Sequence, residues 1–253
     1  MNQGTSLTAT DRAIIIIGDP GTRKTTLCLS FPSPYFLDCD GNMSAPVEQT
    51  GIRNFFYDRA THDSEGKEIH PILRFQHCVK CLNEAVAHPD IKTIIVDSLT
   101  SFTDIVLAEI MRQEHGATAA TETARDAAHN KPMRIQDWGK FAFLLKNIVT
   151  KLRTCGKTIV FTAHNNFEKD EVDSRFKQFI NVPGQSKTTL SGLFTDCWHT
   201  FLEVKGIGEA AKHNFLVRTL PVSDVDHRGV KSSFKNLKRI NTFEEVIAEL
   251  KKL

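Results

Sequence analysis

Residues 18–25 have the types and spacing of a loop that holds phosphate. The octapeptide Gly18-Asp19-Pro20-Gly21-Thr22-Arg23-Lys24-Thr25 matches G-x-x-x-x-G-K-[ST] at every fixed position except the second glycine, where Arg23 stands. In such a loop, backbone N–H groups surround the phosphates, the lysine reaches the β- and γ-phosphates, and the last hydroxyl ligates Mg²⁺. The sequence therefore predicts binding of ATP and Mg²⁺, although an ordinary glycine turn is the alternative. The predicted nucleotide-binding residues are Gly18, Asp19, Pro20, Gly21, Thr22, Arg23, Lys24, Thr25 and Thr26.

Arg23 departs from the pattern at a position where glycine lets the backbone approach phosphate closely. A side chain at this position must point away from the anion. The guanidinium could project outward to contact phosphate, DNA or a neighbouring subunit, or it could weaken nucleotide binding and leave a slow or inactive site. The sequence leaves both outcomes open.

Acidic residues follow two other apolar runs. Thr93-Ile94-Ile95-Val96 ends in Asp97, which is typical of an acid that holds Mg²⁺ through water, while a helix N-cap would also explain it. Leu37-Asp38-Cys39-Asp40-Gly41 offers two carboxylates that could orient and polarise a water molecule. Only one of Asp38 and Asp40 is expected to face the γ-phosphate, and the other can cap the next segment.

His164 follows the apolar run from Thr158 to Thr162. At the end of a strand, its imidazole could contact the γ-phosphate and report the presence of this group to the loop that follows. A histidine that is hydrogen-bonded to backbone explains the same position equally well.

Alternating strands and helices must position these residues. Apolar runs predict strands at residues 13–17, 35–38, 93–96 and 158–162, with two more at 199–204 and 215–220. Helical spacing predicts helices at residues 25–30, 73–86, 102–112 and 135–152. This alternation is typical of a parallel sheet with crossover helices. Thr242 and Glu245 form a capping-box pair that opens a last helix.

Two features that could suggest other chemistry are better explained by packing. Cys78 and Cys81 form a C-x-x-C without a second ligand pair, and their spacing fits the buried face of a helix. Trp138 is expected on the apolar face of the long helix. That face is predicted to contain Ile135, Trp138, Ala142, Leu145, Val149 and Leu152.

Composition limits the classes of protein that the chain can belong to. At 253 residues, with 40% hydrophobic and 25% charged residues, it can bury the core of one large domain. The balance of 32 basic and 30 acidic residues gives a net charge of +2, so a surface for nucleic acid must be local. We expect a cytoplasmic protein with reduced cysteines and no membrane contact, because no apolar run could cross a bilayer and the N-terminal segment is polar.

The ordered motifs resemble the RecA-like ATPase core. GDPGTRKTT after AIIII, FLDCDG, TIIVDSLTSF and TIVFTAHNN are similar to the phage-encoded RecA-like ATPases related to the Sak single-strand annealing proteins, over residues 13 to about 235. The resemblance implies an α/β fold, a RecA-like P-loop core with a mostly parallel twisted sheet and helices on both faces. The expected division is an N-terminal tail (1–12), the ATPase domain (13–235) and a C-terminal helical appendage (236–253).

The resemblance also implies an ATPase that acts on single-stranded DNA in recombination, annealing or repair. Asp40 would be the catalytic carboxylate, where many relatives have glutamate, and His164 the γ-phosphate sensor beside Lys24. The resemblance further implies a homo-oligomer in the host cytoplasm, with a single-strand-binding protein as partner. The basic residues that could reach a neighbouring subunit are Arg218, Arg228 and Lys231.

The segment from Asn165 to Lys187 occupies the position of a DNA-binding loop in this family, and 117–136 that of a second. Aromatic rings beside cations suit single strands, and the candidate contacts are Phe167, Lys169, Arg175, Lys177 and Lys187. A solvated hairpin that turns near Asp173-Ser174 explains the same alternation. Two other functions remain open at this point: a non-hydrolysing, nucleotide-gated DNA-binding module, and a P-loop nucleotide or small-molecule kinase.

Overall fold

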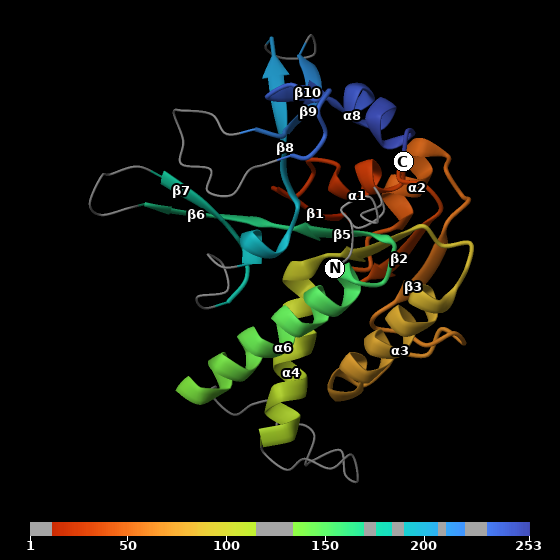
Figure 1. The fold of residues 1–253 in the computed structure, drawn as a ribbon, viewed down its shortest axis with the longest axis vertical. Coiled ribbons are helices and arrows are strands. Elements are labelled where there is room, and N and C mark those ends of the chain that lie inside the picture. Colours follow the sequence, from red (N-terminus) through yellow and green to blue (C-terminus); the bar gives the residue numbers. More distant parts are fainter. Residues whose placement is uncertain (1–11, 115–133, 170–175, 184–189, 207–210, 221–231) are drawn as a thin grey trace, which may run out of the picture.

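A large mixed sheet forms the centre of the protein. The computed structural model describes residues 12–114, 134–169, 176–183, 190–206, 211–220 and 232–253. Its eight-stranded sheet has the order β10-β9-β8-β1-β5-β4-β2-β3 (Figure 1). The strands are β1 (Ala13–Gly18), β2 (Pro34–Asp38), β3 (Phe56–Arg59), β4 (Thr93–Asp97), β5 (Thr158–Ala163), β8 (Asp196–Lys205), β9 (Lys212–Arg218) and β10 (Ile240–Thr242).

The central strands are parallel and buried on both faces. β1 pairs in parallel with β5 and with β8, and β4 pairs in parallel with β5 and with β2. Ile14, Ile15 and Ile16 have no exposed surface, which agrees with the continuous apolar run that covered strands require. Because all these strands run the same way, the residues that follow them meet at one edge of the sheet.

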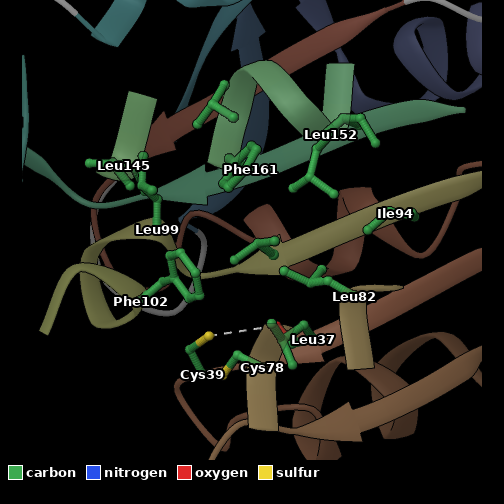
Figure 2. Close-up of a cluster of buried hydrophobic side chains, with 14 of the residues drawn as sticks. Leu37, Cys39, Cys78, Leu82, Ile94, Leu99, Phe102, Leu145, Leu152 and Phe161 are labelled. Atoms are coloured by element: carbon green, nitrogen blue, oxygen red, sulfur yellow. Dashed lines mark hydrogen bonds between the residues drawn. The ribbon is translucent and has the colours of Figure 1, made fainter. Parts of the chain in front are cut away.

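Helices cover both faces of the sheet and close two cores. On one face, α3 (Arg74–Ala87), α4 (Leu99–Glu114) and α6 (Ile135–Arg153) pack on β2, β4 and β5. Figure 2 shows part of the cluster that they form, in which Leu82, Leu99 and Leu145 of the helices lie on the same side of the sheet as Leu37, Ile94 and Phe161 of the strands. On the other face, α1 (Lys24–Cys28), α2 (Ser44–Thr50) and α8 (Phe243–Leu250) contribute to a second cluster around Trp198. The expected fold class, a mostly parallel sheet with helices on both faces, is confirmed.

A two-stranded hairpin leaves the carboxyl edge of the sheet directly after β5. His164 alone separates β5 from β6 (Asn165–Lys169), which pairs antiparallel with β7 (Phe176–Ile180). Figure 1 shows this hairpin extending away from α2 and α8. The hairpin interpretation of the segment after His164 is therefore correct, while its expected turn at Asp173-Ser174 lies outside the described residues.

The last residues, 236–253, pack against the main sheet. Residues 236–253 include a helix, as predicted, but β10 pairs with β9 in the main sheet and Val246 and Leu250 of α8 are fully buried in the second core. The capping box is present, since Thr242 Oγ1 accepts from the Glu245 N–H and the Glu245 carboxylate accepts from the Thr242 N–H. Burial of this apolar face stabilises the packing of the segment against the main sheet.

Candidate nucleotide-binding site

The turn between β1 and α1 is built by close backbone packing. A Cβ on Gly18 would lie 2.6 Å from the Thr200 carbonyl oxygen and 2.7 Å from Thr22 Oγ1, so no side chain fits there. Gly21 has a φ of 81°, in the left-handed region that glycine adopts without penalty. The hydroxyls of Thr22 and Thr200 lie 2.8 Å apart, which fixes the turn to β8. These contacts give the loop one defined shape.

Lys24 lies inside this turn. Its ammonium donates to the carbonyl oxygens of Gly18, at 2.9 Å, and Asp19, at 3.0 Å. The side chain is buried, and burial lowers its pKa, while the charges of Asp97 and Asp40 oppose that effect. A phosphate in the loop would therefore meet a cation held by the backbone and flanked by two carboxylates.

Thr25 and Asp97 form the part of the site that suits a divalent ion. The Thr25 hydroxyl donates to Asp97 Oδ2 at 2.6 Å, and the Thr162 hydroxyl donates to Oδ1 of the same carboxylate. Burial raises the pKa of Asp97, against the lowering effect of these two hydrogen bonds. Mg²⁺ prefers hard oxygen ligands and is commonly held by one or two protein groups together with phosphate and water. The donor set at this point fits that ion.

Asp38 and Asp40 point in different directions, as expected, but the reason is not strand alternation, which would place residues two apart on one face. β2 ends at Asp38, and Asp40 lies in the loop that follows. Asp38 Oδ1 accepts from the backbone N–H groups of Asp40 and Gly41, at 3.1 and 2.7 Å, and its Oδ2 accepts from the Tyr57 hydroxyl at 2.9 Å. Asp38 therefore shapes the loop that carries Asp40. Asp40 lines the cavity instead, and it accepts from Ser98 Oγ at 3.0 Å.

Asp40 lies beside His164 in the wall of the cavity. His164 Nε2 lies 3.8 Å from Asp40 Oδ2, which is an ion-pair distance rather than a hydrogen bond. Burial raises the pKa of Asp40, but contacts with His164, Ser101 and Ser98 outweigh it and hold the pKa below its usual value. The carboxylate is therefore ionised at neutral pH. The backbone N–H of His164 donates to Thr100 Oγ1 at 3.1 Å, which fixes the chain as it leaves β5.

These groups surround one cavity of about 410 Å³. It collects the residues that follow β1, β2, β4 and β5, because β5 lies between β1 and β4 in the sheet. Among the predicted site residues it is lined by Pro20, Gly21, Arg23, Lys24, Thr25, Thr26, Asp40, Asp97 and His164. Most of the residues that line this cavity are therefore among those that the sequence analysis named.

Arg23 turns away from the loop. Its backbone is left-handed, with a φ of 61° and a ψ of 35°, and its guanidinium carbon lies 3.9 Å from the centroid of the Phe215 ring on β9. The side chain thus contacts a residue of the same chain, an outcome absent from the two that the sequence left open. Arg23 also occupies the conformation for which glycine is favoured in this position of the pattern.

Other predicted residues lie elsewhere. Arg218, on β9, is not among the residues lining the cavity, and its guanidinium carbon lies 5.1 Å from the centroid of Phe201. Phe167, on β6, is 50% exposed. Lys169 and Lys177 belong to β6 and β7. The remaining candidates, Arg175, Lys187, Arg228 and Lys231, and most of the segment 117–136 lie outside the described residues.

Several contributors were missed by sequence reasoning. Thr200, Thr162 and Phe215 reach the site from strands whose positions in the sheet the sequence did not reveal. Tyr57 lies on β3, which was not predicted, because Phe56–Arg59 is a short edge strand without a long apolar run. Asn42 and Gln49 enter from the loop after β2 and from α2. A polar residue near the end of each strand was the only available signal.

Other features carry no sign of a different chemistry. Cys78 and Cys81 are buried on α3, as the packing interpretation predicted. Within the described ranges, no group of three or more His, Cys, Asp and Glu side chains is arranged to hold a metal ion. None of the helices in that part of the chain is long and apolar enough to pass through a bilayer.

The mostly parallel sheet, the loop of residues 18–25 and the acid at the end of β4 are the features of a P-loop ATPase domain. The sequence model of the AAA domain family matches residues 10–197, and the chain belongs to that family. Among solved structures, a KaiC-like protein from the hyperthermophilic archaeon Pyrococcus horikoshii OT3 is similar, with 13% identity and a TM-score of 0.47, over 86% of this chain and 83% of that chain. No curated protein matches the sequence.

Proposed function

We propose that the chain hydrolyses ATP with Mg²⁺ in a reaction that single-stranded DNA stimulates, in phage recombination, annealing or repair. The observation that carries this proposal is the position of His164. It lines the cavity beside Asp40 and is the single residue between β5 and the β6–β7 hairpin. The terminal phosphate and the hairpin would therefore be linked through the backbone of this one residue.

The side chains of the cavity support hydrolysis in distinct ways. Lys24 would stabilise the negative charge that develops on the transferred phosphoryl group, and Thr25 and Asp97 would hold Mg²⁺, with Asp97 acting through water. The bound ion supplies charge neutralisation between phosphate oxygens. Asp40, ionised and facing the cavity, would orient and polarise the attacking water. His164, beside Asp40, would contact the γ-phosphate.

The β6–β7 hairpin is the proposed contact with single-stranded DNA. Phe167 is half exposed on β6, and an exposed aromatic ring offers a stacking face to a base. The basic residues of the same segment, Lys169, Arg175, Lys177 and Lys187, would contact the phosphate backbone. By resemblance we also propose a homo-oligomer, with Arg218, Arg228 or Lys231 reaching a neighbouring subunit, and a single-strand-binding protein as partner.

A second candidate is a nucleotide-gated DNA-binding module without hydrolysis. Arg23 favours it, because a left-handed non-glycine residue stands next to the lysine of the loop. Asp40 favours it as well, because its carboxylate has a shorter reach than the glutamate of many relatives.

Phosphate release from ATP and Mg²⁺, with and without single-stranded DNA, separates these candidates. We expect release that DNA accelerates in the native chain and that Lys24→Ala abolishes. Phe167→Ala should reduce the DNA effect, while Phe143→Ala, which changes a 67% exposed ring on α6, should not. Binding of ATP and DNA without any phosphate release would support the gated module instead.

A further inference from the structure

A second cavity of about 750 Å³ lies beside the cavity at the P-loop. Arg23, Thr26 and Phe215 line both cavities, so the two share a boundary. The other walls come from the β8–β9 hairpin and from the start of α8, and include Glu203, Asn214, Leu216, Phe243 and Ile247. Apart from Arg23 and Thr26, these residues follow residue 197, beyond the segment that the family model matches.

The sheet order gives a bound nucleotide a direction. Asp40 and His164 follow β2 and β5, and Asp97 is the last residue of β4; these three strands lie on one side of β1. β8 and β9 lie on the other side of β1, and they carry the second cavity. A triphosphate whose terminal group faces Asp40 would therefore extend past Thr26 toward Phe215.

The lining of the second cavity suits a planar heteroaromatic base. Phe215 is partly buried, and its ring lies 6.1 Å from that of Phe243 at an interplanar angle of 57°. Asn214 Nδ2 lies 3.4 Å from Glu203 Oε2, so an amide and a carboxylate stand beside these rings. The lining also includes the charged or polar side chains of Lys205, His213 and Glu244, so the cavity offers aromatic ring faces together with hydrogen-bonding groups for the edge of a base. The cavity volume also falls within the usual range, about 300–1,000 Å³.

We propose that the second cavity is the nucleoside subsite, in which Phe215 contacts a purine base and Arg23 holds the Phe215 ring in place. This inference rests on the proposed nucleotide binding at the P-loop. It also gives Arg23 a positioning role, since its side chain leaves the phosphates free and stacks on the ring 3.9 Å away.

Binding of two ligands that differ only in the nucleoside tests the proposal. The probes are ATP and inorganic tripolyphosphate, each with Mg²⁺, in titration calorimetry. We expect the native chain to prefer ATP, and Phe215→Ala to weaken ATP binding by about tenfold without changing tripolyphosphate binding. The control is Leu202→Ala, since Leu202 pairs directly with Phe215, is 41% exposed and is not among the residues lining either cavity. This control should retain the native preference.

The outcomes distinguish a failure of the P-loop nucleotide site from a failure of the nucleoside subsite alone. If the native chain binds neither ligand, the proposed nucleotide site is wrong. If it prefers ATP and Phe215→Ala keeps that preference, the nucleoside subsite is overturned while the P-loop site stands. Phe215→Trp provides a second measurement should the alanine variant fail to fold. Its fluorescence should change with ATP and stay constant with tripolyphosphate, and an equal response to both would contradict the proposal.

Discussion

The hydroxyl of Thr25 donates a 2.6 Å hydrogen bond to Oδ2 of Asp97 and so joins the first turn of α1 to the end of β4. The pair places a neutral oxygen and a carboxylate at the same point of the cavity. Because Asp97 is only 5% exposed and already accepts a hydrogen bond from Thr162, its carboxylate has little contact with water. A divalent ion at this point would compensate a charge that burial disfavours.

Asp97→Asn should therefore remove the metal requirement together with the activity. The amide keeps the size of the side chain but cannot supply a negative charge to Mg²⁺. We expect phosphate release to fall by about a hundredfold or more, while ATP binding measured in a chelator stays close to native. Asp104→Asn, on the exposed side of α4, is the control. A native magnesium titration curve from Asp97→Asn would refute the assignment.

Asp40 and Asp97 should give opposite dependences of stability on pH. The pKa of Asp40 is lowered in the folded state, so its contribution is present above the unfolded pKa of about 3.9 and is lost as pH falls through the folded pKa. The pKa of Asp97 is raised, so its contribution is present below about 3.9 and is lost as pH rises through the folded pKa.

Denaturant titrations at pH 3 and pH 7 measure this difference. Relative to the native chain, Asp40→Asn should lose stability between pH 3 and pH 7, and Asp97→Asn should gain it. If the unfolding free energies of the two variants changed in the same direction between pH 3 and pH 7, the pKa shift assigned to Asp40 or to Asp97 would be wrong.

Tyr57→Phe should slow catalysis although Tyr57 touches no phosphate. Its hydroxyl donates to Asp38, which holds the backbone of Asp40 and Gly41. We expect a loss of about 1–2 kcal/mol in unfolding free energy and a kcat lower by about tenfold at unchanged KM. Tyr35→Phe is the matched control, since its hydroxyl donates to Asp58 at 3.0 Å on the same strand pair. A similar kcat loss in both variants would indicate a general effect of β3.

Arg23→Gly and Arg23→Ala should differ in stability. Both remove the stacking on Phe215, but only glycine relieves the left-handed backbone. The glycine variant is expected to be more stable than the alanine variant by about 1 kcal/mol, as measured by denaturant unfolding. Equal stabilities would mean that the loop relaxes to another conformation once the side chain is gone.

Continuous apolar runs made the sheet predictable. Four strands and the residues at or after their ends were located from short apolar runs, because a strand covered on both faces consists almost entirely of apolar residues. The order of the strands in space is a long-range property, so the position of β5 between β1 and β4 was not visible in the sequence. For the same reason Thr200 and Phe215, far along the chain, could not be assigned to the site.

The long helix α6 shows a second limit of prediction from the sequence, which concerns the face of a helix that is buried. Leu145, Val149 and Leu152 are buried as predicted, but Ile135 is 94% exposed and Trp138 is 37% exposed. The buried stripe begins at Asp137 and Phe141 instead. Apolar residues on two sides of a helix define no single face, and the neighbouring elements decide which side is covered. Arg23 was ambiguous for a related reason, because its partner Phe215 lies on a distant strand.

The connection between β5 and β6 has no spare length. One residue, His164, separates the two strands, so their side chains alternate as along one continuous ribbon. Adding or deleting a single residue at this position would exchange the two faces of the hairpin and turn Phe167 to the opposite side. The number of residues between β5 and β6 therefore determines which face of the hairpin carries Phe167.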